Sequence, residues 1–383
     1  MKKVKKYYFL WVFFGLLIYP LISFIINNEM TLNGVTNENV MEAPTVKGIF
    51  DGSFQTSLNE KWDTSFSGRG LLIKIRSQML YSLFYTSPNA NVVIGSDRQL
   101  FEPTYISKEL GLDYKNEQAY YDDQLSKLQS LNQIVENSGK ELYLFITPSK
   151  GYFNKEDIPW QYKFLERSVT ETNNNYSDFI KNLKGTGLKY FIARDFIENN
   201  SSTNIDAPIY YQTGTHWSTS WGNETAIAFA DFISDSGAWN IGELSLEEVS
   251  SSEPEWPNAD LYLSLNLLCE PEIEFYNAKI IVTEEGDHPN VFMRGGSFMG
   301  QSLSGLIKSD VFNEDFYLEN SYYFEDKFSK TGTISSYTAY DEIEIAERIN
   351  QSDIIILEIN EAAIDYMSFG FIDYLFENIH LYE

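Results

Sequence analysis

The chain has 383 residues, of which 43% are hydrophobic and 16% aromatic, so it can bury a sizeable core and is not a disordered protein. A formal net charge of −27 repels nucleic acid and other polyanions. The single cysteine, Cys269, excludes an intrachain disulfide, and the sequence holds no Cys/His cluster of the kind that binds zinc. We therefore expect a stable core, no metal and no nucleic acid partner.

The N-terminus combines a basic tip with an apolar run. Four lysines lie within the first six residues, and the almost unbroken apolar run Tyr7–Ile26 that follows is about long enough to cross a bilayer as a helix. Basic residues favour the cytoplasmic side, which places the rest of the chain outside the cytoplasm. We predict a cytoplasmic tip and transmembrane signal anchor over residues 1–27, with a cleaved signal peptide as the alternative. The polar stretch 28–60 predicts an extracytoplasmic linker before a main domain over residues 61–383.

Helical and strand patterns alternate through the main domain. Apolar residues at helical spacing predict helices over residues 69–85, 121–138, 176–183, 220–233 and 340–350. Short apolar runs predict strands at residues 91–95, 141–146, 189–193, 209–211, 279–282, 291–293, 316–324 and 353–359. The stretch 234–274 is acidic and poor in pattern, which is typical of a surface excursion. Strands bounded by helices predict an α/β fold with a mostly parallel sheet and helices on both faces.

A glycine turn presents a serine. The apolar run Val291–Met293 leads into Gly295 and Gly296, which allow the chain to turn sharply before Ser297. If Ser297 begins a helix, unpaired N–H groups lie near its hydroxyl and can stabilise an oxyanion. This pattern fits a nucleophilic serine, although a serine that only caps the helix fits it too.

Three histidines are available as a base for such a serine. His288 lies in a hydrophilic turn and His380 lies four residues from the C-terminal end of the sequence, so both are expected at the periphery. His216 follows a predicted strand end, where α/β folds place ligand-binding residues. The alternative for His216 is a packed, hydrogen-bonded residue beside Trp217.

Six segments in fixed order resemble the AlgX/AlgJ-type polysaccharide O-acetyltransferases, a family with an SGNH hydrolase-like fold. They cover roughly residues 62 to 364 and are Trp62–Arg69, Asn91–Phe101, Phe145–Lys150, Tyr210–Trp217, Gly295–Phe298 and Ile354–Glu361.

The resemblance implies a membrane-anchored, extracytoplasmic enzyme that acetylates a cell-surface or secreted polysaccharide. Ser297 would be the acyl-accepting nucleophile and His216 the general base, with Gly295, Gly296 and Phe298 forming the turn around the oxyanion. The substrate-lining candidates are Tyr211, Thr215, Trp217 and Lys150. No cofactor would be bound, because an MBOAT-type membrane acyltransferase would supply the acetyl group.

Two glycines depart from the family pattern. Gly214 and Gly296 stand where the family has aspartates, and the aspartate at the first position is the one that orients the histidine. Another acid, such as Asp206 or Glu224, could take over this role. The sequence therefore leaves open a non-catalytic, glycan-binding or scaffolding homologue, and a carbohydrate esterase of the same fold. The acidic surface favours a neutral or zwitterionic polysaccharide as substrate.

Overall fold

The computed structural model describes residues 2–26, 30–34, 44–65, 68–114, 118–166, 174–200, 204–251, 253–321, 323–328, 333–334 and 342–381. The chain divides into two compact units. The first comprises Met1–Val92 and Leu261–Pro271, and the second comprises Val93–Asp260 and Glu272–Glu383.

The first unit is helical. Among the described residues its helices are α1 (Lys2–Ile26), α2 (Val46–Asp51), α3 (Ser53–Ser65), α4 (Arg69–Phe84) and most of α12 (Asp260–Ser264). Helix α4 confirms the helix predicted over residues 69–85, whereas α2 and α3 occupy much of the stretch predicted as a linker. The side chain of Gln78 on α4 accepts the backbone N–H groups of Leu268 and Cys269, which ties the segment Leu261–Pro271 to this helix.

No helix within the described residues is both long and apolar enough to cross a membrane. The transmembrane anchor predicted within residues 1–27 is therefore not supported.

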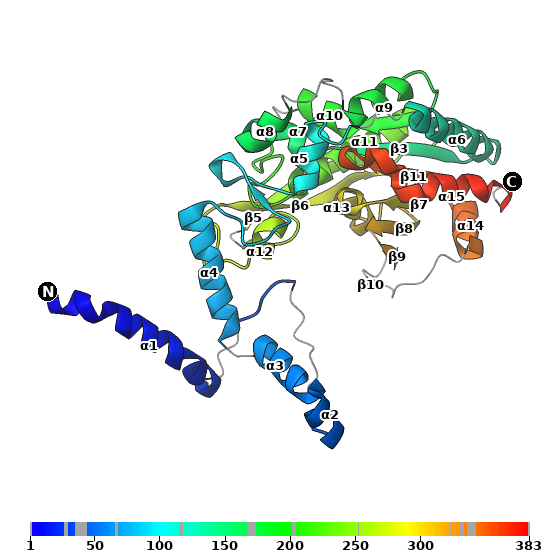
Figure 1. The fold of residues 1–383 in the computed structure, drawn as a ribbon. Helices are drawn as coiled ribbons and strands as arrows, with labels where there is room; N and C mark the ends of the chain where they lie inside the picture. The colour runs from blue at the N-terminus through cyan, green and yellow to red at the C-terminus, as the bar shows by residue number, and fades with distance from the viewer. Residues whose placement is uncertain are drawn as a thin grey trace. The chain divides into compact units, whose positions relative to one another are not determined.

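The second unit is built on a seven-stranded sheet in the order β10-β9-β8-β7-β11-β3-β4. The strands are β3 (Glu141–Thr147), β4 (Lys189–Ile192), β7 (Asn290–Gly295), β8 (Glu314–Ser321), β9 (Tyr323–Phe328), β10 (Thr333–Ile334) and β11 (Ile354–Asn360). The run from β8 to β4 is parallel throughout, and β9 pairs antiparallel with both of its neighbours, β8 and β10. The predicted α/β fold with a mostly parallel sheet is confirmed, as Figure 1 shows.

Two smaller sheets accompany it. Strands β1 (Val93–Ile94) and β2 (Leu100–Phe101) pair antiparallel, as do β5 (Gly242–Ser251) and β6 (Phe275–Glu285). The strand predicted at residues 279–282 is confirmed within β6, although it lies outside the main sheet. Strand β5 lies within the stretch 234–274, which was expected to be poor in pattern. The strand predicted at residues 209–211 is only an isolated bridge between Tyr210 and Trp217.

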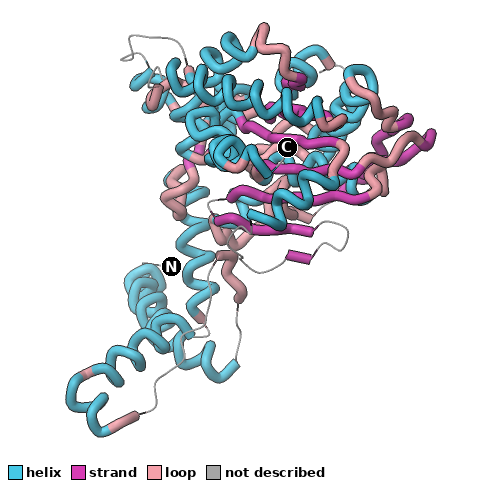
Figure 2. Tube along the Cα trace, turned by 90° about the vertical axis from the view of Figure 1, so that its right-hand side faces the viewer, coloured by secondary structure: helices cyan, strands magenta, loops and turns pink. Residues whose placement is uncertain are grey.

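Helices cover both faces of the sheet, as predicted (Figure 2). One face packs against α6 (Gln118–Asn137), α9 (Asn175–Leu183), α14 (Glu342–Gln351), the 3₁₀ segment η4 (Glu361–Gly370) and α15 (Phe371–Glu377). The other packs against α10 (Ala193–Asn199), α11 (Thr219–Ser236) and α13 (Ser297–Lys308). The remaining short elements are η1 (Ser96–Arg98), α5 (Pro103–Glu109), α7 (Lys150–Phe153), η2 (Lys155–Asp157), α8 (Trp160–Glu166), α12 (Asp260–Ser264) and η5 (Ile379–Leu381).

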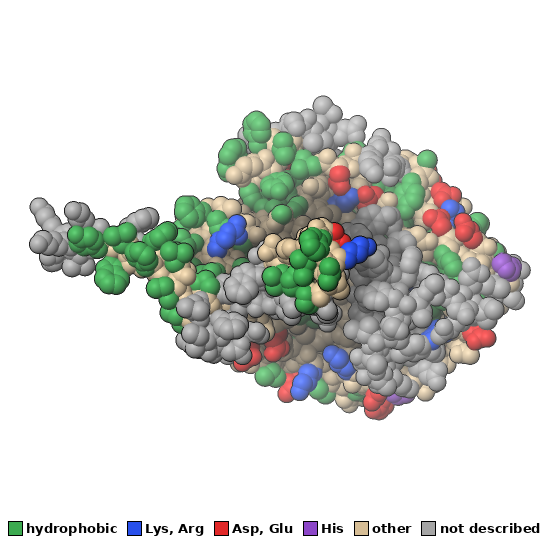
Figure 3. All heavy atoms as spheres, turned by 60° about the horizontal axis from the view of Figure 1, so that its bottom comes forward, with side chains coloured by type: hydrophobic (Ala, Val, Ile, Leu, Met, Phe, Trp, Pro, Cys, Tyr) green, Lys and Arg blue, Asp and Glu red, His purple; other side chains and the backbone are tan. Residues whose placement is uncertain are grey.

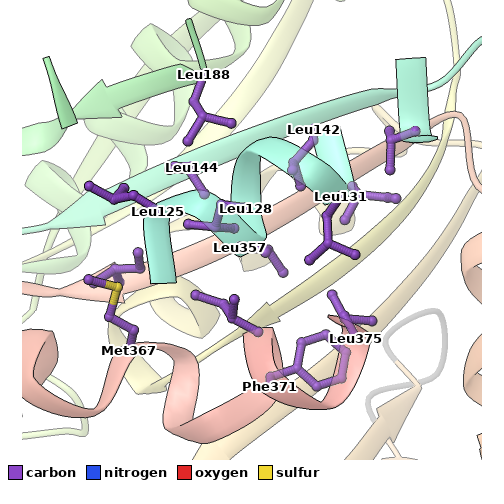
Figure 4. Packing of buried hydrophobic residues seen from close by; sticks show 14 of the residues in the cluster. Leu125, Leu128, Leu131, Leu142, Leu144, Leu188, Leu357, Met367, Phe371 and Leu375 are labelled. Atoms are coloured by element: carbon purple, nitrogen blue, oxygen red, sulfur yellow. The ribbon is translucent and has the colours of Figure 1, made fainter. Parts of the chain in front are cut away.

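The alternation of side chains along β3 explains the two layers. Leu142 and Leu144 point to the layer of α6, whereas Tyr143 and Phe145 point to the layer of α11. Figure 4 shows how leucines of α6 pack over Leu144 and over Leu357 of β11. Burying one such side chain contributes about 1.5–3 kcal/mol, so the central strands are held firmly from both sides.

Charged side chains are spread over the outside. On the face drawn in Figure 3, the acidic side chains of the described residues lie in several small groups, some with a lysine or arginine beside them. The acidic side chains visible on this face therefore do not form a single patch.

Candidate active site

Ser297 lies where β7 ends and α13 begins. Gly296 is the N-cap of α13 and Ser297 is its first residue. Neither Gly295 nor Gly296 adopts a positive φ, so the turn does not depend on left-handed backbone. Gly295 is required for close packing instead, because a Cβ there would lie 2.5 Å from the Cβ of Glu358 on β11.

A buried carboxyl group supports this turn from below. Glu358 accepts the backbone N–H of Gly296 at 2.7 Å and a short hydrogen bond from the hydroxyl of Thr147 on β3. Burial raises the pKa of Glu358 to about 7, against the opposing effect of both hydrogen bonds. Three neighbouring strands of the sheet thereby fix the backbone that carries Ser297.

His216 connects the serine to an acid. Its Nε2 lies 2.8 Å from Ser297 Oγ, and its Nδ1 lies 2.8 Å from Asp260 Oδ2. The side chains of His216 and Asp260 are 11% and 14% exposed, so the pair is shielded yet reachable. With the proton on Nδ1 held by the carboxylate, Nε2 is free to accept the serine proton. The three side chains form a nucleophile, a base and an orienting acid.

Asp260 is held by the loop that precedes His216. Its Oδ1 accepts the backbone N–H of Thr215 at 2.9 Å. Just before it in the chain, Asn258 accepts the Thr213 hydroxyl at its carbonyl and the Thr219 N–H at its side chain, at 2.7 and 3.2 Å. The segment with Asp260 is thus fastened to both flanks of His216.

The acid against His216 is Asp260, which was not among the predicted substitutes Asp206 and Glu224. A Cβ at Gly214 would lie 3.0 Å from Asp260 Oδ1 and within 2.9 Å of the carbonyl oxygens of Asn258 and Pro257. The carboxylate of Asp260 therefore borders the space that a side chain at position 214 would enter.

The acids proposed as substitutes lie elsewhere. The backbone N–H of Asp206 donates to the side chain of Glu248. Glu224 lies near Asp231 and Glu248; burial is the main cause of its raised pKa, and these two charges add to it. Asp260 was missed because it lies in a stretch interpreted as a surface excursion, and no motif links it to His216. Its position at the start of a short helix is the only local signal.

The candidate residues beside the triad fall into two groups. Phe298 packs against the imidazole, with ring centroids 4.9 Å apart, and helps to fix the plane of His216. Trp217, Tyr211, Thr215 and Lys150, which we expected to line the substrate, are all buried. They lie beneath the surface of the site and support it from within.

Lys150 shows this support most clearly. Its side chain is fully buried, and its Nζ donates to the carbonyl oxygens of Tyr211 at 2.8 Å and of Gly214 at 2.6 Å. Burial lowers the pKa of Lys150 to about 7. The ammonium group holds the two ends of the turn that leads into His216.

Two residues near the triad had no sequence signal. Trp256 is 58% exposed, and its ring centroid lies 5.9 Å from that of His216. Glu102 lies close enough to His216 and Asp260 for their charges to affect its pKa. This pKa is raised, mainly because Glu102 is buried. Trp256 is therefore an exposed aromatic ring beside the imidazole of His216.

The other features of the site concern charge and metals. The N–H groups in the first turn of α13 have no intrahelical acceptor, so they are the candidates for an oxyanion hole next to Ser297. His288 is exposed and contacts Asp310 and Glu285, as expected for a surface histidine. Among the residues that the structure describes, no group of three or more His, Cys, Asp and Glu side chains could hold a metal ion.

Solved structures with a related chain trace are known. The chain is similar to the O-acetyltransferase domain of Pseudomonas putida AlgJ, with 16% identity over 75% of this chain and 99% of that one and a TM-score of 0.48. It is also similar to Pseudomonas aeruginosa AlgX, with 15% identity over 74% and 67% of the two chains and a TM-score of 0.42. For Bacillus cereus PatB1 the identity is 9% over 71% and 96%, with a TM-score of 0.45. No protein-family model and no curated protein matches the chain. With similarity this low, the function has to be argued from the geometry of the site.

Proposed function

We propose that the protein is an O-acetyltransferase that acetylates hydroxyl groups of a polysaccharide through an acetyl-Ser297 intermediate. The observation that carries the proposal is the continuous hydrogen-bonded chain from Ser297 through His216 to Asp260. The six ordered motifs favour transfer to a sugar over other serine chemistry.

In the first half-reaction, His216 Nε2 takes the proton of Ser297 as Oγ attacks the carbonyl carbon of an acetyl ester or thioester. The tetrahedral oxyanion that forms would be stabilised by the N–H groups at the start of α13. Collapse breaks the bond to the donor, whose leaving group receives the proton from His216. Asp260 stabilises the imidazolium that exists between these two proton transfers.

In the second half-reaction, His216 takes the proton of a sugar hydroxyl, whose oxygen attacks the acetyl carbon on Ser297. The bond to Ser297 Oγ breaks, and His216 returns the proton to it. The enzyme is then restored, and the product is an O-acetylated sugar. If water replaces the sugar hydroxyl, the same steps release acetate, which is the esterase alternative.

The non-catalytic alternative was motivated by the glycines at positions 214 and 296. The carboxylate of Asp260 against His216 weakens the first of these reasons. The glycan-binding role is still compatible with the fold, but it leaves the alignment of three reactive side chains without a purpose.

The location and the donor are proposed from the sequence and the family resemblance. The lysine-rich tip and the apolar run Tyr7–Ile26 suggest a place outside the cytoplasm for the catalytic unit. Acetyl-CoA is absent there, so a membrane acyltransferase of the MBOAT type would have to export the acetyl group. Co-purification of the full chain with such a protein would test this part.

The decisive experiment is acylation of the purified full-length chain by 4-nitrophenyl acetate, followed by intact-mass measurement. We expect one added acetyl group, mapped by peptide analysis to Ser297, and none in Ser297→Ala. Ser126→Ala, at an exposed position of α6, is the matched control and should be acylated like the wild type. Acetylation that persists in Ser297→Ala would refute the proposed nucleophile. Adding an oligosaccharide then separates transfer, seen as an acetylated sugar, from hydrolysis, seen as acetate alone.

A further inference from the structure

A pocket of about 590 Å³ opens beside the triad in the second unit. Helices α11 and α13 and strand β6 form its walls, and the loop Glu255–Pro257 forms its remaining side. A volume of this size is sufficient for a small ligand. None of the three triad residues lines it, so the pocket is an adjoining space and not the reaction centre itself.

Two residues connect the pocket to the reaction centre. Trp256 lines the pocket and also stands edge-on to the imidazole of His216. Gln301 lines the pocket one helical turn after Ser297, and residues four apart share a face of a helix. A molecule that fills the pocket can therefore extend along α13 towards the serine.

The walls of the pocket carry buried polar groups without partners. Gln301 is 5% exposed and Asn223 is 3% exposed. Both polar atoms of Gln301, the Oδ1 of Asn223 and the Oγ1 of Thr219 have no hydrogen-bond partner among the described residues. Buried polar groups are normally paired, because leaving them unpaired is costly. Four such atoms around one pocket point to a ligand that supplies both donors and acceptors.

The chemistry of the lining fits a sugar. A pyranose ring has an apolar C–H face that packs on an exposed indole such as Trp256, and hydroxyl groups that both donate and accept. Amide side chains such as Gln301 and Asn223 offer the complementary donors and acceptors. The rim carries Lys279 and Lys308 together with Glu255, so it does not exclude a neutral or zwitterionic chain.

We propose that this pocket is the acceptor subsite of the acetyltransferase, a role that rests on the function proposed above. One sugar unit of the acceptor glycan stacks on Trp256 and exchanges hydrogen bonds with Gln301 and Asn223. A neighbouring unit of the same chain then presents its hydroxyl to His216 Nε2. The pocket thereby selects a polymer over water or a single sugar.

Binding is tested without chemistry in the full-length Ser297→Ala protein. Calorimetric titration with cellohexaose, chitohexaose and mannohexaose should show binding of at least one of these neutral hexasaccharides. Adding Trp256→Ala or Gln301→Ala to this protein should raise the Kd of that hexasaccharide roughly tenfold, because each substitution removes one contact with the sugar. Trp256→Phe keeps an aromatic face and should restore most of it.

Trp160→Ala is the matched control, because Trp160 is 71% exposed on α8 and does not line the pocket. It should bind like the parent, and circular dichroism should show that all variants are folded. Binding of none of the three hexasaccharides, or binding unchanged by both pocket substitutions, would overturn the subsite.

Failure of the proposed function looks different. A chain that binds a hexasaccharide through Trp256 and Gln301, yet is not acetylated at Ser297 by 4-nitrophenyl acetate, would keep the pocket and refute the transferase. A chain that is acetylated at Ser297 but fails the binding test would keep the transferase and refute the pocket as its acceptor subsite.

Discussion

The carboxylate of Asp260 lies 2.8 Å from Nδ1 of His216, although the two residues are 44 positions apart in the chain. The other oxygen of Asp260 accepts the backbone N–H of Thr215, the residue just before His216. One carboxylate therefore fixes both the imidazole and the backbone that carries it. This arrangement gives Asp260 the role of the orienting acid.

Asp260→Asn should reduce the turnover of 4-nitrophenyl acetate by about 10⁴-fold, because the amide favours the wrong imidazole tautomer and cannot stabilise the imidazolium. Steady-state kinetics would measure kcat, with thermal denaturation as a check on folding. Asp206→Asn is the control and should stay close to wild type. A large loss of kcat in Asp206→Asn, with the kcat of Asp260→Asn unchanged, would contradict the role of Asp260 as the orienting acid.

Gly214→Asp should impair the enzyme, although the sequence pattern alone suggests that it would restore a missing acid. The new Cβ would lie 2.8 and 2.9 Å from two backbone carbonyl oxygens and 3.0 Å from Asp260 Oδ1. A second carboxylate there would also repel that of Asp260. We expect a lower kcat and a lower melting temperature, with Gly214→Ala showing the steric part alone. A gain in acetyl turnover by Gly214→Asp would contradict this account.

The central elements of the fold could be predicted because their patterns are local. The apolar runs of β3, β7 and β11 and the helical spacing of α6 identify buried strands and an amphipathic helix. Ser297 and His216 were found because each lies in a recognisable motif at the end of an apolar strand-like run.

Asp260 could not be predicted, because an orienting acid is defined by its distance from a histidine and not by its neighbours in sequence. Gly214, which stands where the family has the orienting aspartate, even suggested that this acid was missing. Lys150 was predicted at the site, but its burial beneath the turn depends on how distant segments pack, which no local pattern records. The same is true of the pocket beside Trp256, whose walls come from four separate segments.

Lys150→Met should destabilise the chain and slow catalysis. The buried carbonyl oxygen of Gly214 would lose its donor, at about 1–3 kcal/mol for a group left unsatisfied, and that of Tyr211 would keep only the Gly214 N–H at 3.2 Å. The turn before His216 would loosen, so kcat should fall as well. Urea denaturation and kinetics measure the two effects.

Lys163→Met is the control for Lys150→Met, because Lys163 contacts the exposed Glu156 at the surface, through an ion pair worth at most about 1 kcal/mol and a hydrogen bond to its backbone carbonyl. Equal effects of the two substitutions on the free energy of unfolding would show that the buried ammonium has no special part in holding the turn.

Glu358 should make the stability of the chain depend on pH. Burial raises its pKa from the ordinary 4.5 to about 7, so between these values the folded chain keeps a proton that the unfolded chain has released. The contribution of Glu358 to the free energy of unfolding should therefore be largest below about pH 4.5, fall as the pH rises, and level off above about 7. The loss is on the order of a few kcal/mol. Glu361, whose pKa burial also raises to about 7, contributes in the same direction.

Glu358→Gln should flatten the decline between about pH 4.5 and 7, because the amide keeps the shape and does not titrate. Part of the decline should remain, since Glu361 still titrates. Lys150 acts above about pH 7. Burial lowers its pKa from 10.5 to about 7, so between these values the folded chain has released a proton that the unfolded chain still holds. The contribution of Lys150 therefore makes stability rise with pH in this range. Urea denaturation at half-unit pH steps would separate the two ranges. An unchanged slope below pH 7 in Glu358→Gln would mean that Glu358 is already ionised in the folded chain, and that its contacts with Gly296 and Thr147 outweigh its burial.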